Sequence, residues 1–406
     1  MFHPRFQWAM CALALTGAVG CGSFPVQAGT VKKVFVIAME NHNWTQPSSQ
    51  TNPQQIFQNP AAPFINSLVN GTSGISDQVA YANGYINAGI GVHPSEPNYI
   101  WAEAGTNFGV NNDDDPYHTN CTPDTVQSST QHLSTFITIN KKAWRSYQED
   151  TDLTTVGGQL TNVVLPRNQW TVPLTSIHGN FASGVNQFNG STQFNYAVKH
   201  NPQAYFTDSN GGNDTTTANP ARLQYAPLQQ LFLDLATNNM ADYTWITPNQ
   251  FNDQHTALTG GFQGVTGDAA NIKQGDNFLS IIIPVIMASN AYRDHGAIII
   301  WWDESEQDGT ANDNPDDLTK TVGEIVISRD AHPNVGGVPF SSDVFLTHSS
   351  DLRTMQEIFH VTKPFFLGDA IHANDLSSLC EDGVIPHGDG DGDRDDGACG
   401  RNRDDR

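Results

Sequence analysis

A serine lies at a point where the sequence predicts that a helix begins. Ser95 stands in the segment His93-Pro94-Ser95-Glu96-Pro97-Asn98-Tyr99, and the pattern after it is helical as far as Ala104. The backbone N–H groups and the positive dipole end of a helix N-terminus attract an anionic group such as phosphate. A hydroxyl at this position can be a nucleophile if a bound metal ion lowers its pKa. A serine here can also do no more than cap the helix.

Two pairs of oxygen-bearing side chains follow directly after apolar runs. Glu40-Asn41 follows the run at 34–39, and Asp303-Glu304 follows the run at 297–302. Carboxylate and amide oxygens are hard ligands that suit Mg²⁺, Ca²⁺, Mn²⁺ or Zn²⁺. Taken singly, an acidic residue after a strand is usually a helix cap or a solvent-facing loop residue. The two pairs together with Ser95 predict a divalent metal site.

Histidines at two further positions could exchange protons with a reacting group. His255 stands in Asn252-Asp253-Gln254-His255, after the weaker apolar run at 243–246, and His348 precedes the last helical pattern. Histidine suits this task because its ordinary pKa of about 6.5 is close to neutral pH. The chain has 14 histidines, and a single histidine is more often structural than catalytic. Asp253 beside His255 strengthens that position only slightly.

The apolar runs are typical of strands that are buried on both faces of a parallel sheet. Between them lie patterns in which apolar side chains recur at helical spacing. This alternation predicts an α/β fold with a central, mostly parallel sheet flanked by helices. Ligands of such sheets bind beyond the carboxyl ends of the strands, so the polar segments after the runs should converge there. The expected helices cover residues 63–69, 226–236, a segment capped by Asp276, and 351–359.

The chain is strongly acidic. Its 406 residues include 19 Lys and Arg against 42 Asp and Glu, which gives a formal net charge of −23. A surface with this charge repels nucleic acid and anionic membranes, so we expect neither as a partner. It also repels a phosphate ester, so a site for such a substrate needs a local positive centre, which a bound cation would supply. No later stretch approaches about 20 apolar residues, so we expect no stable membrane span.

The N-terminal segment, residues 1–28, has the features of an export signal. Arg5 gives it a basic start, residues 8–19 are almost wholly apolar, and Ala28 completes a small-residue cleavage site. We therefore expect a secreted or periplasmic protein, with lipoprotein anchoring through Cys21 as the alternative.

Two other stretches differ in composition from the remainder. Residues 110–220 are rich in Asn, Thr, Gly and Asp, which indicates a loop-rich insertion or cap inside a domain that spans 29–380. Residues 381–406 form an acidic tail rich in Asp and Gly. The Asp spacing of the tail is similar to that of calcium-binding loops, but the glycine that an EF-hand loop needs is missing. A solvated tail is therefore expected.

The polar segments, taken in their order along the chain, resemble a known family. They are similar to blocks of the phosphoesterase family that contains bacterial acid phosphatases and phosphocholine-specific phospholipases C, within the wider alkaline phosphatase-like superfamily. The resemblance runs from about Val31 to Ala370 and is poor in the Asn-rich middle. It rests on residues 34–41, 93–99, 252–255, 302–304 and 348–354.

The resemblance implies a metal centre. Glu40, Asn41, Asp303 and Glu304 would hold one divalent metal ion, and Ser95 would bridge it as the nucleophile. One ion is expected rather than two, because the Asp303-Glu304 pair lacks the histidine that two-zinc relatives have.

The resemblance also implies which residues handle the substrate. Asp253, His255 and His348 would lie where two-metal relatives hold the second ion, and without that ion the two histidines would contact the phosphate or the leaving group. In the implied reaction Ser95 attacks phosphorus, His255 or His348 protonates the leaving oxygen, and water then hydrolyses the phosphoserine. His200 falls in another similar block and is expected to be structural.

These observations lead to one function and two alternatives. The leading function is an acid-phosphatase-like phosphomonoesterase that acts on a small phosphate ester. The first alternative is a phospholipase C that cleaves a lipid head group, for which aromatic residues between Trp144 and Trp170 could form a cage around choline. The second, of another class, is a secreted calcium-binding protein without catalysis. Ser95 at a helix start argues against that reading, because an ion-binding protein would not need it.

Overall fold

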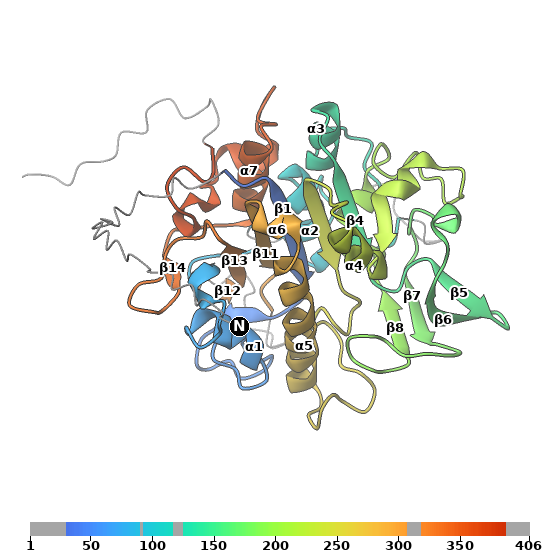
Figure 1. The fold of residues 1–406 in the computed structure, drawn as a ribbon, viewed down its shortest axis with the longest axis horizontal. Coiled ribbons are helices and arrows are strands. Elements are labelled where there is room, and N and C mark those ends of the chain that lie inside the picture. Colours follow the sequence, from blue (N-terminus) through green and yellow to red (C-terminus); the bar gives the residue numbers. More distant parts are fainter. Residues whose placement is uncertain (1–29, 90–91, 117–124, 307–317, 387–406) are drawn as a thin grey trace, which may run out of the picture.

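An eight-stranded sheet forms the centre of the structure, a computed structural model that describes residues 30–89, 92–116, 125–306 and 318–386 (Figure 1). The strand order is β14-β3-β13-β11-β1-β10-β4-β9. From one edge to the other, these strands are β14 (Phe340–Ser342), β3 (Val79–Ala82), β13 (Glu324–Ser328), β11 (Gly296–Trp302), β1 (Lys33–Met39), β10 (Tyr243–Thr247), β4 (Trp144–Gln148) and β9 (Tyr225–Pro227).

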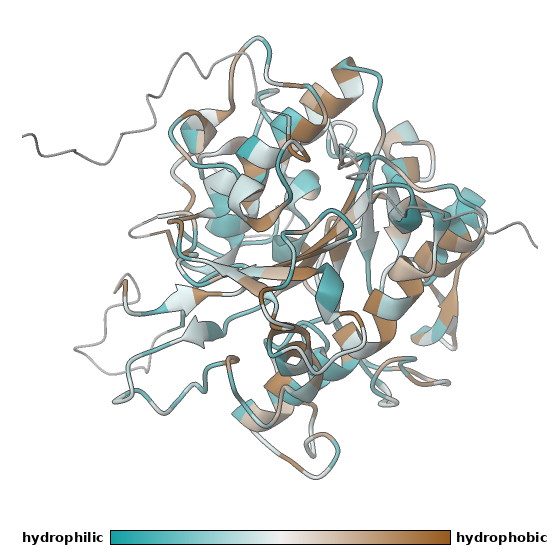
Figure 2. Ribbon diagram, turned by 60° about the vertical axis from the view of Figure 1, so that its left-hand side comes forward, coloured by the Kyte–Doolittle hydropathy of each residue, from teal (hydrophilic) through white to brown (hydrophobic). Residues whose placement is uncertain are grey.

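The three apolar runs of the sequence are neighbouring strands in the middle of this sheet. Strand β1 lies between β10 and β11 and is parallel to both. Residues Val34 to Met39 are buried, as are all residues of β10 and β11, because helices cover both faces. Figure 2 shows the apolar strands in the interior and the more polar segments around them.

The sheet is mostly parallel, as expected. Strand β13 is the exception, since it pairs antiparallel with both β11 and β3. The register that matters for function is that of β1 and β11, in which Met39 is opposite Trp302. The two acidic pairs that follow these strands therefore leave the sheet at the same point.

The helices form two groups. Helices α2 (Ser95–Ala104), α3 (Leu133–Ile139) and α7 (His348–Ile358) contact one another, and α5 (Asp268–Met287) contacts α1 (Pro63–Val69) and α6 (Asn290–Arg293). A further helix, α4 (Gln229–Ala236), contacts edge strand β9. Short 3-10 turns are η1 (Ser76–Gln78), η2 (Arg167–Gln169), η3 (Val198–His200), η4 (Pro202–Tyr205), η5 (Pro220–Gln224), η6 (Gly368–Ile371) and η7 (Leu376–Leu379).

Three of the expected helices have different starts, and the one expected over 351–359 begins at His348. The helix expected over 226–236 begins at Gln229, because residues 225–227 pair with β4 as strand β9. The helix that Asp276 was expected to cap begins at Asp268, so that Asp276 lies inside it. The Asp276 carboxylate instead accepts the N–H groups of Phe64 and Ile65, at 3.1 and 2.8 Å. It therefore caps α1, a helix more than 200 residues away in the sequence.

The expected insertion at 110–220 contains one strand of the central sheet, because β4 pairs in parallel with β10. Outside the sheet lie two hairpins, β5 (Leu153–Val156) with β6 (Gln159–Val164) and β7 (Ile177–Asn180) with β8 (Gln193–Tyr196). A small sheet pairs β2 (Asn43–Thr45) with β12 (Thr321–Val322).

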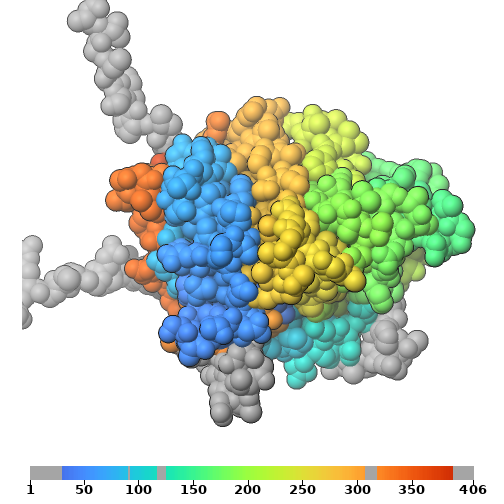
Figure 3. Space-filling model, turned by 90° about the horizontal axis from the view of Figure 1, so that it is seen from below, coloured from blue at the N-terminus to red at the C-terminus, as the bar shows by residue number. Residues whose placement is uncertain are grey.

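The hairpins of this insertion lie at one side of the molecule (Figure 1). Seen from below, they adjoin the segment that leads into α5, which in turn adjoins the residues after β1 (Figure 3). The predicted export signal at 1–28 and residues 387–406 of the predicted tail lie outside the described residues. No helix in the described ranges is long and apolar enough to cross a membrane.

Candidate active site

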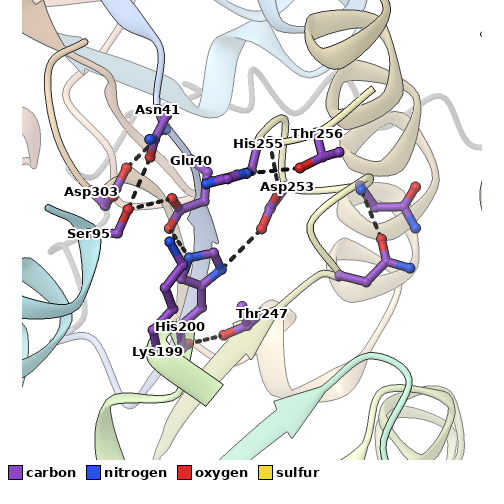
Figure 4. A network of polar contacts seen from close by, with 12 residues as sticks. Glu40, Asn41, Ser95, Lys199, His200, Thr247, Asp253, His255, Thr256 and Asp303 are labelled. Atoms are coloured by element: carbon purple, nitrogen blue, oxygen red, sulfur yellow. Dashed lines mark hydrogen bonds and ion pairs between the residues drawn. The ribbon is translucent and has the colours of Figure 1, made fainter. Parts of the chain in front are cut away.

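Ser95 is the first residue of α2 and lies at the carboxyl edge of the sheet. Its Oγ is 3.0 Å from Glu40 Oε2, 3.2 Å from Asn41 Oδ1 and 3.3 Å from Glu304 Oε1. The Asn41 backbone N–H donates to Asp303 Oδ1 at 3.0 Å, which joins the two strand ends. The structure thus brings the other four residues that the sequence predicts to hold a metal ion to the Ser95 hydroxyl; Figure 4 shows three of them, Glu40, Asn41 and Asp303.

The buried acids of this cluster disfavour each other's ionisation. Burial, followed by the charges of Asp303 and Asp253, raises the pKa of Glu40 well above its ordinary value. Burial, followed by the charge of Glu304, raises the pKa of Asp303 to about 8. Carboxylates that face one another in a low dielectric need a compensating positive charge to stay ionised.

The donor set fits a hard divalent cation in its chemistry, since it offers three carboxylates and an amide oxygen. The side chains are not already drawn together as ligands: within the described ranges, no group of three or more His, Cys, Asp or Glu is arranged to hold a metal ion. The Asn41 amide also fits better when turned, because its nitrogen then donates to Glu40, Asp303 and Ser95. Binding of a cation would require this amide to present its oxygen.

A tyrosine and a histidine hold two of these carboxylates through hydrogen bonds. The Tyr99 hydroxyl donates to Glu40 Oε1 at 2.5 Å, one helical turn after Ser95. His93 Nδ1 lies within hydrogen-bond distance of Glu304 Oε2. Neither role could be read from the residue types, because both depend on contacts across more than 50 positions of the chain.

Asp253 and His255 form a second group beside the acids. Asp253 is fully buried; its backbone oxygen accepts the Glu40 N–H at 2.8 Å, and its Oδ1 accepts the His255 N–H at 2.8 Å. Burial, and then the charge of Lys199, lowers the pKa of His255 to about 4. His255 is therefore neutral before an anionic substrate arrives, and the negative charge of that substrate would raise its pKa.

His200 lies between the two groups, although the sequence predicted only a structural role. Its Nε2 is 3.2 Å from Glu40 Oε1, and its Nδ1 is 3.3 Å from Asp253 Oδ2. Its ring stacks on Tyr99, with 5.0 Å between the ring centroids. The preceding residue, Lys199, extends its side chain towards Glu40 (Figure 4). The signal that could have indicated both residues is the polar Lys199-His200-Asn201 segment in an otherwise weakly patterned region.

His348 occupies a different position from the one expected. Trp301 Nε1 donates to His348 Nδ1 at 2.9 Å, and the Tyr85 hydroxyl is 2.7 Å from the same nitrogen. Because Trp301 can only donate, Nδ1 is the acceptor and Nε2 carries the proton, which it donates to the Asp303 backbone oxygen at 2.5 Å. Burial lowers the pKa of His348 to about 3. Both nitrogens are thus engaged, and this geometry does not support proton donation to a leaving group by His348.

The helix N-terminus is also less open than expected. The N–H groups of the first turn were expected to attract phosphate, but the Glu96 N–H donates to Asp113 Oδ1 at 3.0 Å. Residue 97 is proline and has no N–H to offer.

The two tryptophans that could have contributed to a choline cage lie away from Ser95. Trp144 is the first residue of β4 and therefore lies at the edge of the sheet opposite Ser95, where it packs on Tyr225. Trp170 is also buried, and its Nε1 donates to the Leu165 backbone oxygen at 2.8 Å. Both rings belong to the core rather than to the site.

Comparison with known proteins gives a consistent family. The Phosphoesterase family matches residues 30–362. An acid phosphatase of Aspergillus fumigatus is 31% identical over 165 residues, which are 40% of this chain and 28% of that protein. A phosphate-repressible acid phosphatase of Penicillium chrysogenum is 24% identical over 214 residues, which are 53% of this chain and 39% of that protein. The matches thus span well under half the length of these relatives.

Solved structures resemble the chain at low identity. A protein in the alkaline phosphatase superfamily from Vibrio parahaemolyticus has a TM-score of 0.43 at 10% identity, over 82% of this chain and 67% of that one. The lipoteichoic acid synthase LtaP from Listeria monocytogenes has a TM-score of 0.42 at 10% identity, over 84% and 74%. Similarity at this level does not indicate a shared reaction.

Proposed function

Because this chain belongs to the phosphoesterase family, we propose that it is an exported, metal-dependent phosphoric monoester hydrolase with Ser95 as its nucleophile. The observation that supports this function best is the surroundings of Ser95 Oγ. Oxygens of Glu40, Asn41 and Glu304 lie 3.0 to 3.3 Å from it, on the ends of two adjacent parallel strands. A divalent cation held by Glu40, Asn41, Asp303 and Glu304 would lower the pKa of the hydroxyl and neutralise phosphoryl charge.

The chain's own residues would divide the reaction among them. Ser95 Oγ attacks phosphorus and forms a phosphoserine as the bond to the leaving oxygen breaks. His255, oriented by Asp253, lies on the far side of Glu40 from α2. Once the anionic substrate has raised its pKa and it has taken up a proton, His255 can donate that proton to the leaving oxygen, and the neutral ring can then accept one from the attacking water. Hydrolysis of the phosphoserine by that water releases phosphate and restores Ser95.

The positions of Trp144 and Trp170 make a phosphomonoester a better candidate substrate than a choline diester. Trp144 lies at the opposite edge of the sheet and Trp170 is packed in the core, so neither ring can contact a head group at Ser95. The two tryptophans therefore give no support to the choline cage that the phospholipase C alternative could have used. Export rests on the sequence features of residues 1–28 and would be checked by N-terminal sequencing of the mature protein.

The experiment that tests the function compares two substrates, p-nitrophenyl phosphate and p-nitrophenylphosphorylcholine. We expect the purified protein to release p-nitrophenol from the monoester, and we expect both EDTA and Ser95→Ala to abolish that release. Ser67→Ala, at a serine in α1 whose hydroxyl bonds only the Phe64 backbone oxygen, is the matched control. Hydrolysis of the choline diester alone would indicate a phospholipase C. Activity that persists in Ser95→Ala would rule out the serine mechanism.

A further inference from the structure

Lys199 places a positive charge inside the acidic site. It belongs to η3. Its side chain is only 13% exposed, although lysine side chains are usually exposed to solvent. The side chain runs beside His200 and ends near the Glu40 carboxylate (Figure 4). Its charge lowers the pKa of His255 and opposes ionisation of His200, so it acts on the group that we propose for proton transfer.

Asp113 joins this ammonium group to the first turn of α2. Lys199 Nζ is 2.8 Å from Asp113 Oδ2, and the other oxygen of the same carboxylate accepts the Glu96 N–H at 3.0 Å. One side chain therefore ties the lysine to the residue that follows Ser95. A carboxylate that occupies this N–H also removes it from phosphate binding, which leaves the Lys199 ammonium group as a positive charge beside this helix start.

The segments that carry this pair are fixed to each other. Ser176 donates through its N–H and its hydroxyl to Asp115, at 2.8 and 2.7 Å. The Val198 N–H donates to the Ser176 hydroxyl oxygen at 2.9 Å. The loop with Asp113 and the turn with Lys199 therefore keep their relative position through a third segment, and the ammonium group is held before substrate arrives.

We propose that Lys199 binds the phosphoryl group of the substrate and sets a preference for dianionic phosphate monoesters over monoanionic diesters. The inference rests on the proposed function and specifies that the preferred substrate is a dianion. A monoester carries its second negative charge above a pKa of about 6, whereas a diester never gains one. A fixed cation in a buried site stabilises that second charge strongly, because the local dielectric is low.

A lysine that only compensates the neighbouring acids would behave differently. Such a residue would support both substrates to the same extent, because it would act on Glu40 rather than on the phosphoryl oxygens. The ratio of kcat/KM for a monoester to kcat/KM for a diester therefore separates the two roles.

The test measures p-nitrophenyl phosphate and bis(p-nitrophenyl) phosphate hydrolysis at about pH 8, above the second phosphate pKa. We expect Lys199→Met to lower kcat/KM for the monoester about 100-fold and that for the diester less than about tenfold. Lys199→Arg should recover most of the monoester activity. Lys33→Met, which removes a similarly ion-paired lysine at the opposite edge of the sheet, should change neither. Equal losses on both substrates, or no loss, would overturn the inference.

Asp113→Asn provides a second variant in case Lys199→Met does not fold. The asparagine keeps an oxygen for the Glu96 N–H but loses the ion pair with Lys199. The ratio of kcat/KM for the monoester to kcat/KM for the diester should therefore fall, by a smaller factor than in Lys199→Met. An unchanged ratio in a folded Asp113→Asn protein would show that Asp113 does not position Lys199.

Binding of inorganic phosphate gives a readout that does not require turnover. We expect calorimetry with Mg²⁺ or Mn²⁺ present to show phosphate binding that weakens about tenfold or more in Lys199→Met and is unchanged in Lys33→Met. If the wild type binds phosphate through Lys199 but hydrolyses no ester, the proposed function fails and the binding site stands. If it hydrolyses esters and the variant binds phosphate as well as the wild type, the inference fails and the function stands.

Discussion

At the scale of single residues, His255 and His348, the two histidines that could protonate the leaving group, have different surroundings. His255 is only partly engaged, since its Nδ1 lies 2.9 Å from the Thr256 hydroxyl and its backbone N–H bonds Asp253. His348 uses both ring nitrogens to join Trp301 to the Asp303 backbone. We therefore expect His255 to act on the leaving group and His348 to position Asp303.

Leaving groups of different acidity distinguish these roles. We expect His255→Ala to lower kcat for phenyl phosphate about 100-fold or more, and that for p-nitrophenyl phosphate by clearly less, because p-nitrophenolate needs little help from an acid. His348→Ala should lower both rates by the same factor and reduce the free energy of unfolding by about 2 kcal/mol, since it leaves buried hydrogen-bonding groups unpaired. A stronger loss on phenyl phosphate in His348→Ala would reverse the assignment.

A third histidine stabilises the fold away from the site. His132 is buried between Glu103 of α2 and Asp208, at 3.1 and 2.8 Å. Burial alone lowers the pKa of His132, but the hydrogen bonds to Asp208 and Glu103 outweigh it and raise the pKa. Burial acts against ionisation of Asp208 as well, and the bond and charge of His132 reverse this and lower its pKa.

These shifts predict how stability depends on pH. A raised histidine pKa contributes stability fully below the unfolded value of about 6.5, and the contribution is lost as the pH rises through the folded value. The lowered pKa of Asp208 contributes above about 3.9 and is lost in stronger acid. In urea titrations, the difference between wild type and His132→Gln should therefore shrink as the pH rises from about 6. The exposed His178 provides the control substitution, and a difference that grows with pH would contradict the prediction.

At the scale of elements, helix α5 packs directly under the loop that carries Asp253 and His255. A Cβ added at Gly275 would lie 2.2 Å from Gln254 Cγ and 2.7 Å from Met39 Cε. Gln254 cannot move easily, because its amide accepts from Trp302 Nε1 at 2.8 Å and donates to the Ile272 backbone oxygen at 3.1 Å. Close packing of α5 against Gln254 thus fixes the position of the loop that carries Asp253 and His255.

Gly275→Ala tests this packing. Alanine is favoured over glycine in a helix by about 1 kcal/mol, but overpacking a fixed core costs about 1 to 3 kcal/mol. We therefore expect a net loss of stability in urea titrations, together with a several-fold lower kcat because Gln254 lies between Asp253 and His255. Gly74→Ala, where the added Cβ meets nothing within 4 Å, is the control. A Gly275→Ala protein as stable and active as wild type would show that the loop position does not depend on this contact.

At the scale of the whole molecule, the net charge of −23 works against the binding of an anionic substrate. The repulsion acts over a distance of about 30 Å in 0.01 M salt but only about 10 Å in 0.1 M salt. Lys199 attracts the substrate only at short range, because it is enclosed by Asp113 and the acids of the site. Salt should therefore assist association rather than weaken it.

We expect kcat/KM for p-nitrophenyl phosphate to rise a few-fold between about 0.01 and about 0.1 M NaCl, while kcat stays nearly constant. The rise should be smaller for bis(p-nitrophenyl) phosphate, which carries one charge. Steady-state kinetics over this range check the prediction, and a fall in kcat/KM with added salt would show that local attraction exceeds the repulsion by the whole molecule.

The parts of the fold that could be predicted are those with a local pattern. The three central strands are continuous apolar runs, and α1, α2 and α7 have helical spacing with a start signal. Strand β4 was missed because its sequence, Trp144 to Gln148, is mostly polar in type although it is largely buried. Asp276 was assigned to the wrong helix because a buried carboxylate inside one helix can cap another, which depends on packing.

The sequence by itself determined the residues that surround Ser95. The carboxyl ends of neighbouring parallel strands meet at one edge of a sheet, so the polar pairs after two apolar runs were expected to converge there, and the structure adds the start of α2. Only the tertiary structure decided what His200, His348 and Lys199 do. Lys199 meets Asp113 across 86 positions, and His348 meets Asp303 across 45. The direction of a side chain and its partner at such separations depend on how the elements pack, and no local spacing encodes them.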